Sequence, residues 1–533
     1  MGRLLHFMFA MAIMMPLSAF ALPSNCTVGT NVYYVSQAGA DTNSQAQAKS
    51  KSTPWKYAPY MHSFTGAYTH TAGDCFVFRG GDTWVAADYF TIAKGGSSTS
   101  PDYYGVDQSW YTGGSWARPI FDIQATLPHV DTNRNSNIFL FQANWVTVDN
   151  WEIVHGTCST TGPTSQNYFS MSGQDGIVVT NGYFHAFEPP SSGCGSGTTG
   201  DGNGIAVWIY ESVNSSSGCD GSFDHNIVDG TDGSGAQGYE TIVYDPAPCA
   251  AISYNVVHDV CSGFGGNFTQ ADDNLIANFG GALGKFDCGS QGIHAHAIRS
   301  NNDADVYNNA IHDTDGEVIM LNPNLTSGHS SSQVYNNVLW HNVPIAIQTG
   351  DNGSSTSGTI EIYNNTIDCD SDGGFGSCIR FEHNLASITL YNEHHIIAAS
   401  APLGGVCLTN APFSGGGCGS AGTFTYNAAN NLFQTQAQAA STGYTNSEQY
   451  VFSPSSSSSP TVGIGTNSTS MCNSIMTFLC SDTTYGSSQS GGTLTAPAAK
   501  AVARPVSTAW DAGAYLFAST TVVPPTGLAA IVQ

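Results

Sequence analysis

The chain has 533 residues, and its 13 Lys and Arg against 39 Asp and Glu give a formal net charge of −26. Such an acidic chain lacks the basic patch that binding to nucleic acid or to anionic lipid requires. Disorder is also excluded, because only 10% of the residues are charged while 41% are hydrophobic. The composition fits one or two large domains rich in uncharged polar residues and Gly.

The first 21 residues have the pattern of a secretory signal. Arg3 precedes an apolar run over residues 4–15, and Ala19-Phe20-Ala21 fits a small-x-small cleavage site. We therefore expect a mature chain from Leu22 that is secreted, periplasmic or bound at the cell surface. No later apolar stretch approaches the ~20 residues that cross a bilayer, so we expect no transmembrane segment.

All 14 cysteines lie after this signal, which favours disulfides over metal thiolates. Close spacing suggests bridges that staple single loops, although spacing does not fix connectivity. The closely spaced pairs are Cys249 and Cys261, Cys369 and Cys378, Cys407 and Cys418, and Cys472 and Cys480.

A motif of one apolar residue, Tyr and two Asn recurs in the centre of the chain at intervals of 28 residues. Its copies are 306–309, 334–337 and 362–365, followed by Tyr391-Asn392, with weaker copies upstream at 146–150, 223–226 and 252–255.

Each repeat contains two short strands with alternating apolar residues around a turn rich in Gly, Asn and Asp. A unit this short cannot bury its apolar face alone, so the units are expected to stack into a solenoid of parallel strands. Asn suits the bends, because it tolerates a left-handed backbone and its amide can bond to the copy one coil away.

The two ends of the chain carry further motifs. Val32-Tyr33-Tyr34-Val35-Ser36, Pro54-Trp55 and the segment 73–84 precede the repeats, and Trp510-Asp511-Ala512-Gly513-Ala514-Tyr515 follows them. With the repeats, these motifs resemble the secreted right-handed parallel β-helix proteins related to pectate lyases. The resemblance implies an all-β fold: a right-handed parallel β-helix with coils of about 28 residues and long disulfide-stapled loops. It implies one domain over residues 22–517 and a short tail over 518–533. This superfamily holds lyases, hydrolases, epimerases, esterases and adhesins, so it leaves the activity open.

Strand alternation predicts which side chains face outward. If the apolar residues of each strand point inward, the outward set contains aromatic, imidazole, guanidinium and carboxylate groups. These residues are Trp208, Tyr210, His294, His296, Arg380 and Glu382. Such a face suits stacking on sugars, and we expect Trp208, Tyr210, Arg380 and Glu382 to bind substrate.

His294 and His296 are the sharpest candidates for catalysis. Two residues apart on one strand, their side chains would lie on one face roughly 6.5 to 7 Å apart, with Arg299 just beyond. The alternative is that both are ordinary exposed polar positions.

Asp272-Asp273 lies one coil earlier, with Lys285 in the following loop. Paired carboxylates followed about twenty residues later by Gly-x-His are similar to the polygalacturonase-like glycoside hydrolases, which implies acid and base roles. The family's upstream Asn-Thr-Asp block and later Arg-x-Lys are missing, and a surface turn is the alternative. A lyase would instead need a cationic or basic group, which Lys285, Arg299 and Arg380 offer in the central coils.

Asp368-Cys369-Asp370-Ser371-Asp372-Gly373 has the spacing with which a loop wraps Ca²⁺. The bidentate Glu expected at the twelfth position is Ile379. Calcium bound by Asp368, Asp370 and Asp372 is therefore one hypothesis, and an Asp-rich turn is the other.

These observations predict a carbohydrate-active protein that cleaves a polysaccharide, as a lyase or a glycoside hydrolase, on an exposed sheet face. The net charge favours a neutral glycan or a contact bridged by Ca²⁺. The alternative is a non-catalytic glycan-binding, adhesin or structural protein that uses the same face.

Overall fold

The computed structural model describes most of the chain. The described residues are 22–123, 136–156, 166–171, 173–187, 205–210, 221–231, 239–244, 251–266, 268–280, 296–300, 303–322, 331–341, 345–349, 358–369, 378–381, 385, 387–397, 406–408, 425–444, 452–472, 476–485, 487–490, 492–495 and 501–517.

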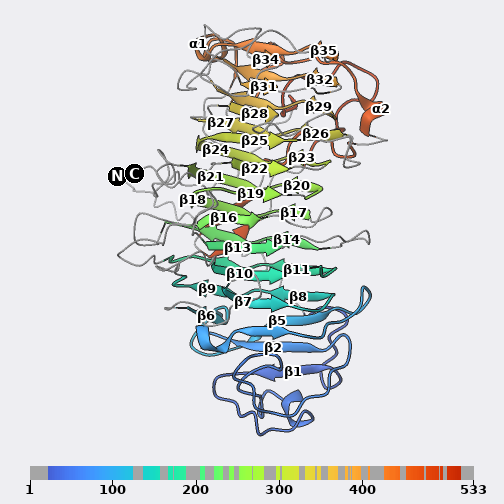
Figure 1. Ribbon diagram of the computed structural model, residues 1–533. Helices are drawn as coiled ribbons and strands as arrows, with labels where there is room; N and C mark the ends of the chain where they lie inside the picture. The colour runs from blue at the N-terminus through green and yellow to red at the C-terminus, as the bar shows by residue number, and fades with distance from the viewer. Residues whose placement is uncertain are drawn as a thin grey trace, which may run out of the picture.

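Three long sheets run the length of the molecule (Figure 1), and every strand pair within them is parallel. Sheet A contains β1 (Val32–Val35), β2 (Cys75–Gly80), β5 (Asp102–Tyr111), β8 (Val146–Asp149), β11 (Ile177–Thr180), β14 (Ser222–Asp224), β17 (Ala251–Ser253), β20 (Gln270–Asp272), β23 (Asp305–Tyr307), β26 (Ser331–Tyr335), β29 (Thr359–Tyr363), β32 (Ser387–Tyr391) and β35 (Thr425–Ala429). Sheet B contains β4 (Phe90–Ile92), β7 (Ser136–Phe141), β10 (Gln166–Met171), β13 (Ile205–Tyr210), β16 (Tyr239–Tyr244), β19 (Phe264–Gly266), β22 (His296–Ser300), β25 (Glu317–Leu321), β28 (Ile345–Thr349), β31 (Ile379–Phe381) and β34 (Val406–Leu408). Sheet C contains β3 (Thr83–Val85), β6 (Ile120–Asp122), β9 (Glu152–Val154), β12 (Tyr183–Phe184), β15 (Ile227–Asp229), β18 (Val256–Val260), β21 (Leu275–Gly280), β24 (Ala310–Asp315), β27 (Val338–Trp340), β30 (Thr366–Asp368), β33 (His394–Ile396) and β36 (Leu432–Gln434).

Short elements outside these sheets complete the described part of the chain. They are η1 (Gln47–Lys49), η2 (Ala86–Asp88), α1 (Gln436–Ala440), α2 (Thr469–Cys472) and the antiparallel pair β37 (Ser488–Ser490) and β38 (Thr493–Thr495). Among the helices that the structure describes, none is long and apolar enough to cross a membrane.

The chain passes through sheets A, C and B in turn, so each coil holds three strands and not the two that the repeat suggested. The structure confirms the all-β right-handed parallel β-helix. Neighbouring coils are 28 residues apart from Asn309 to Asn337 and from Asn337 to Asn365. Upstream the interval ranges from 19 residues (Asn255 to Asn274) to 44 (Gly182 to Asn226).

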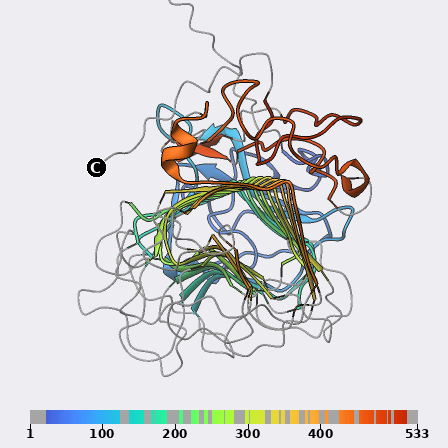
Figure 2. The ribbon, with the colours of Figure 1, turned by 90° about the horizontal axis from the view of Figure 1, so that it is seen from above.

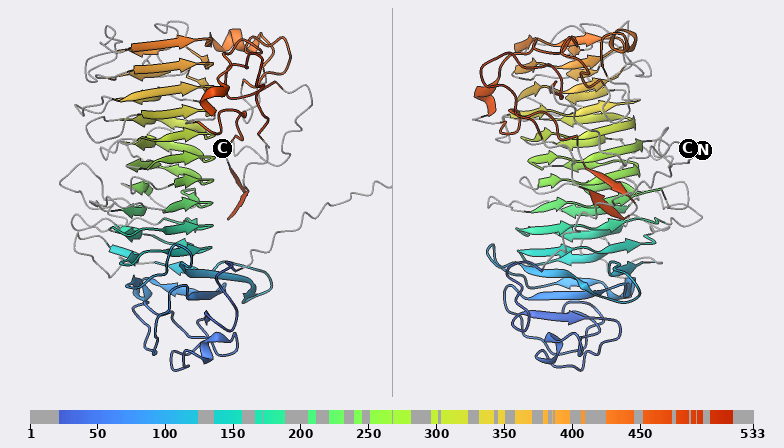
Figure 3. Two further views of the ribbon diagram at one scale, coloured as in Figure 1. Left: turned by 90° about the vertical axis from the view of Figure 1, so that its right-hand side faces the viewer. Right: turned by 180° about the vertical axis from the view of Figure 1, so that it is seen from behind.

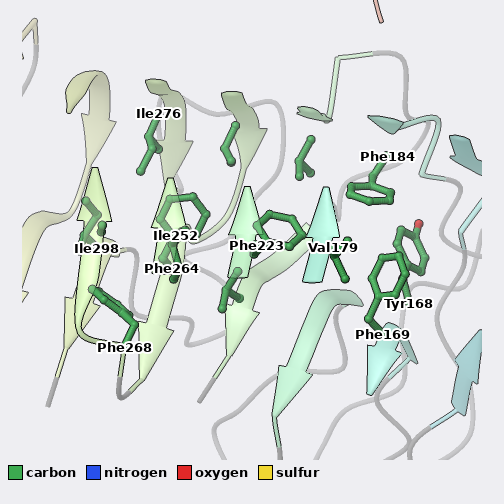
Figure 4. Close-up of a cluster of buried hydrophobic side chains, with 14 of the residues drawn as sticks. Tyr168, Phe169, Val179, Phe184, Phe223, Ile252, Phe264, Phe268, Ile276 and Ile298 are labelled. Atoms are coloured by element: carbon green, nitrogen blue, oxygen red, sulfur yellow. The ribbon is translucent and has the colours of Figure 1, made fainter. Parts of the chain in front are cut away.

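The core is a stack of apolar rows between the three sheets (Figure 4). Sheet A contributes Val179, Phe223 and Ile252 in successive register, and Ile276 of sheet C and Ile298 of sheet B belong to the same core. Each side chain packs against its copies one coil above and below. Full burial of such a side chain stabilises the fold by about 1.5–3 kcal/mol.

An asparagine ladder follows the turn between sheets A and C, as the repeats predict. The Nδ2 of Asn309 donates to the Oδ1 of Asn337 at 3.0 Å, and that of Asn337 to Asn365 at 2.9 Å. Upstream members of the ladder are Asn226, Asn255 and Asn274. At its far end Asn365 donates to the buried carboxylate of Glu393, where the repeat would have Asn.

After the last coil, the described residues between 452 and 517 run back along the outside of the solenoid; we call this segment the strap (Figures 2 and 3). It lies over the turn between sheets A and C, where it meets the first Asn of three repeats, Asn336, Asn364 and Asn392. These Asn residues have left-handed φ angles near 56° to 60° at Asn336, Asn364 and Asn392. Their amides donate to strap carbonyls, for example Asn336 to Ser481 at 2.9 Å and Asn364 to Asp511 at 2.9 Å.

Disulfides Cys369–Cys378 and Cys472–Cys480 confirm two of the predicted pairs. Cys26–Cys75, which joins the start of the described chain to β2, was not predicted. Cys261 is also disulfide-bonded, whereas Cys249 and Cys418, the other halves of two predicted pairs, lie outside the described residues.

Candidate functional site

The strands of sheet B do not alternate simply, which decides what faces outward. Several of them carry two consecutive core residues, such as Tyr168 and Phe169 in β10 or Ala297 and Ile298 in β22. The residues one position after this pair form a row across neighbouring strands, and this row lies outside the core. It comprises Arg299, Met320, Gln348 and Arg380 in direct register.

Two guanidinium groups therefore occupy one row of sheet B. Arg299 and Arg380 are three strands apart, a Cα separation of roughly 14 to 15 Å. Ile379 and Phe381 are core residues, so Arg380 faces away from the core as predicted. Arg380 is only 5% exposed and Gln348 4%, whereas Arg299 is partly exposed. The accessible end of the row is therefore at Arg299.

At the start of the same strands, His296 in β22 faces Glu317 in β25. The Nδ1 of His296 lies 3.7 Å from the Oε2 of Glu317, and the two residues are partners in the strand register. The imidazole is 6% exposed and the carboxylate side chain 25%. His296 is therefore not the open surface position that alternation predicted, and Glu317 is the exposed side of the pair.

The sequence patterns did not point to Glu317 or Gln348 as site residues. A sequence feature could nevertheless have identified Glu317. This residue begins the strand after the turn at Asp315-Gly316, and its register partner is the histidine that the sequence singled out. Together, His296, Glu317, Arg299, Gln348 and Arg380 form what we call the sheet B site.

Trp208 and Tyr210 lie in β13. Trp208 is in register with Phe169 and Val243, and Tyr210 is in register with Met171. Their outward position and their contact with substrate stay predictions. Lys285, His294 and Glu382 lie outside the described residues.

Asp272 and Asp273 lie far from this site in the fold, at the end of β20 in sheet A. Both are buried, at 3% and 4% exposure, and Asp273 has a left-handed φ of 54°. Their carboxyl groups contact Ser253, Gln270 and Thr484, the last from the strap. The two residues form a turn, which is the alternative given above, and the strap covers this turn. Neither Asp contributes to the group that contains His296 and Arg299.

Of the three predicted calcium ligands, the structure describes only Asp368. The Asp368 carboxylate accepts two hydrogen bonds from the Nε2 of Gln436, at 3.2 and 3.1 Å. Asp370 and Asp372 lie outside the described residues. In the part of the chain that the structure describes, no group of three or more His, Cys, Asp or Glu could hold a metal ion.

Sheet A carries a second row of residues, in which every ionisable group is a carboxylate. Asp305 in β23, Gln333 in β26 and Glu361 in β29 are in register, and both carboxylates are partly exposed. Burial, with Asp303 and Glu361 nearby, raises the pKa of Asp305 to about 6. Burial also raises the pKa of Glu361. Unlike the sheet B site, this row contains no base and no cation.

No protein-family model matches the sequence, and neither does any curated protein. Several solved structures have a similar fold. A GH136 lacto-N-biosidase from Eubacterium ramulus is 11% identical, with a TM-score of 0.40 over 76% of this chain and 68% of that one. A rhamnogalacturonan lyase is 10% identical, with a TM-score of 0.34 over 76% and 88% of the two chains. A pectate lyase is 15% identical, with a TM-score of 0.29 over 91% and 96%. At these identities the likeness concerns the fold alone. The continuous parallel sheets and the internal ladder give the chain the fold of a right-handed parallel β-helix.

Proposed function

We propose that the protein is a secreted enzyme that cleaves a polysaccharide at the sheet B site. The observation that carries the proposal is the approach of His296 to Glu317 at 3.7 Å, on the strand that also carries Arg299. A solenoid offers a long face along which an extended glycan can lie. The signal-like N-terminus and the disulfides support secretion.

The chemistry of the pair suits proton transfer. A carboxylate beside the Nδ1 of an imidazole favours the tautomer that carries its proton there, which leaves Nε2 as the basic atom. Arg299 can neutralise negative charge that the substrate carries or develops during bond cleavage. These roles serve a lyase, which removes a proton, and a hydrolase, which protonates a leaving group.

The test is a panel of neutral and uronate-containing polysaccharides. Products are followed by absorbance at 235 nm, which reports the unsaturated ends of a lyase, and by reducing ends, which both reactions release. We expect His296→Gln to lower kcat/KM about 10²- to 10⁴-fold, the usual contribution of a general acid or base. His312→Gln is the matched control, because His312 pairs with Asp313 on sheet C.

A non-catalytic glycan-binding protein is the second candidate. The low exposure of His296 and Arg380 favours it, because a reacting group must reach its substrate. A glycan of the panel that binds the wild type without any product would establish this role and refute catalysis. Equal activity of His296→Gln and the wild type would remove His296 from the mechanism.

A further inference from the structure

The strap is held to the solenoid at a buried pair of carboxyl groups. The Thr484 hydroxyl donates to the Oδ1 of Asp273, and the Ser487 hydroxyl donates to the Asp273 carbonyl oxygen at 3.0 Å. Further along the strap, Gln489 contacts the imidazole of His258. The hairpin β37–β38 ends these contacts at Gly492, whose carbonyl oxygen accepts from Arg118 at 2.6 Å (Figure 3).

Asp272 and Asp273 are consecutive residues, both buried, and the charge of one raises the pKa of the other, so the pair retains one proton between them. Asp272 also accepts from the Ser253 hydroxyl and from the Nε2 of Gln270 at 2.9 Å. Among the residues that the structure describes, the groups that face the pair from neighbouring coils and from the strap are uncharged. They are Ser253, Tyr254, Gln270, Tyr307, Thr484 and Ser487.

We propose that the Asp272–Asp273 pair is a pH-sensitive latch that holds the strap onto the solenoid while the two groups share a proton. When the second group ionises, two carboxylates at 3% and 4% exposure repel each other without a neutralising cation among the groups that face them. Undocking of residues 481–490 admits water to the pair and relieves the repulsion.

The direction of the pH dependence follows from the docked state. Burial, together with the charge of Asp272, raises the pKa of Asp273 to about 8. An exposed Asp has a pKa near ~3.9. The docked strap therefore binds the proton more tightly than the released strap. Docking is therefore strongest below pH ~4. Its equilibrium constant falls by up to about tenfold per pH unit as the pH rises, and it reaches its lowest value above pH 8.

Hydrogen exchange of the full chain, read on peptides covering residues 481–490 at pH 5 to 9, tests the latch. After correction for intrinsic exchange rates, we expect opening of the strap in the wild type to increase at least ~10²-fold across this range. Asp273→Asn cannot ionise, so its opening should change less than about tenfold. Asp272→Asn carries the same expectation and serves if Asp273→Asn does not fold.

Asp482→Asn is the matched control within the strap. Burial raises the pKa of Asp482 to about 6, so its own titration ends below the upper part of the range. This variant should keep the wild-type increase between pH 6 and 8. A pH profile of Asp273→Asn identical to that of the wild type, or a wild-type strap that opens equally at all pH values, would overturn the proposal. Neither outcome depends on glycan cleavage.

Discussion

The outward faces of sheets A and B differ in how they use the repeat. On sheet A, Tyr307, Tyr335 and Tyr363 occupy one register row, and the rings of Tyr307 and Tyr335 stack at 5.0 Å. Phe478 of the strap stacks on Tyr307 at 5.0 Å, so this row is covered by the protein itself. On sheet B the corresponding row changes at each coil, from Arg299 to Met320 and Gln348. The repeated face stabilises the solenoid, and the varied face is the one on which we propose the catalytic site.

The largest expected effect is on the repeated side. Asn337 donates to Val306 and Tyr335 carbonyl oxygens and to Asn365, and accepts from Asn309. Asn337→Ala leaves several buried groups unpaired, and we expect it to lower the free energy of unfolding by about 3–5 kcal/mol. Denaturant unfolding measures this loss. Asn336→Gly, which removes the side-chain contacts with the strap and tolerates the left-handed φ of this position, should cost less; an equal cost would contradict the distinction between the two Asn positions.

Removal of Arg504 should separate the strap from the solenoid while the sheet B site stays intact. Its guanidinium, at 2% exposure, donates to Asn336, Gly513 and Ala514 within 3.1–3.2 Å. Arg504→Met should therefore cost about 2–4 kcal/mol. Hydrogen exchange of residues 452–517 should increase strongly, and glycan turnover should be unchanged. Loss of turnover would show that the strap supports the sheet B site.

On the outward face of sheet B, Arg299→Gln should change substrate binding and leave the stability of the fold nearly unchanged. Arg299 is partly exposed and lies outside the core, so the free energy of unfolding should change by less than about 1 kcal/mol. If Arg299 binds substrate, KM should rise about tenfold for charged glycans, a loss typical of one charge-assisted hydrogen bond. If Arg299→Gln lowered the free energy of unfolding as much as Asn337→Ala, Arg299 would stabilise the fold and not bind substrate.

The smallest effect concerns calcium at residues 368–372. If this loop binds Ca²⁺, calorimetric titration should give heat with the wild type and none with Asp370→Ala. Since the Gln436 amide already contacts Asp368, we expect weak binding. Absence of heat in both proteins would leave an Asp-rich turn closed by Cys369–Cys378.

The sequence predicts the fold well because one interaction repeats. Each Tyr-Asn-Asn copy must satisfy the same buried turn, so the ladder is visible as a period of 28 residues. The site is harder to predict from the sequence. Two consecutive core residues, such as Ala297 and Ile298, break the alternation from which the outward-facing side chains were predicted. The strap is not predictable in this way, since its segment 452–517 carries no repeat and its partners are ordinary side chains on distant coils.

Glu393 limits how the solenoid can lengthen. Its carboxylate accepts the hydrogen bond from Asn365 at 3.1 Å and bonds to His395 at 2.9 Å, entirely inside the protein. An Asn coil can be copied next to itself, because each amide both donates and accepts. A tandem duplication of the Glu393 coil would instead set one buried carboxylate against another, with a backbone N–H but no side-chain amide to donate between them. Gene duplication can therefore add turns within the ladder but not at Glu393, which makes this residue a terminus for growth by repeat expansion.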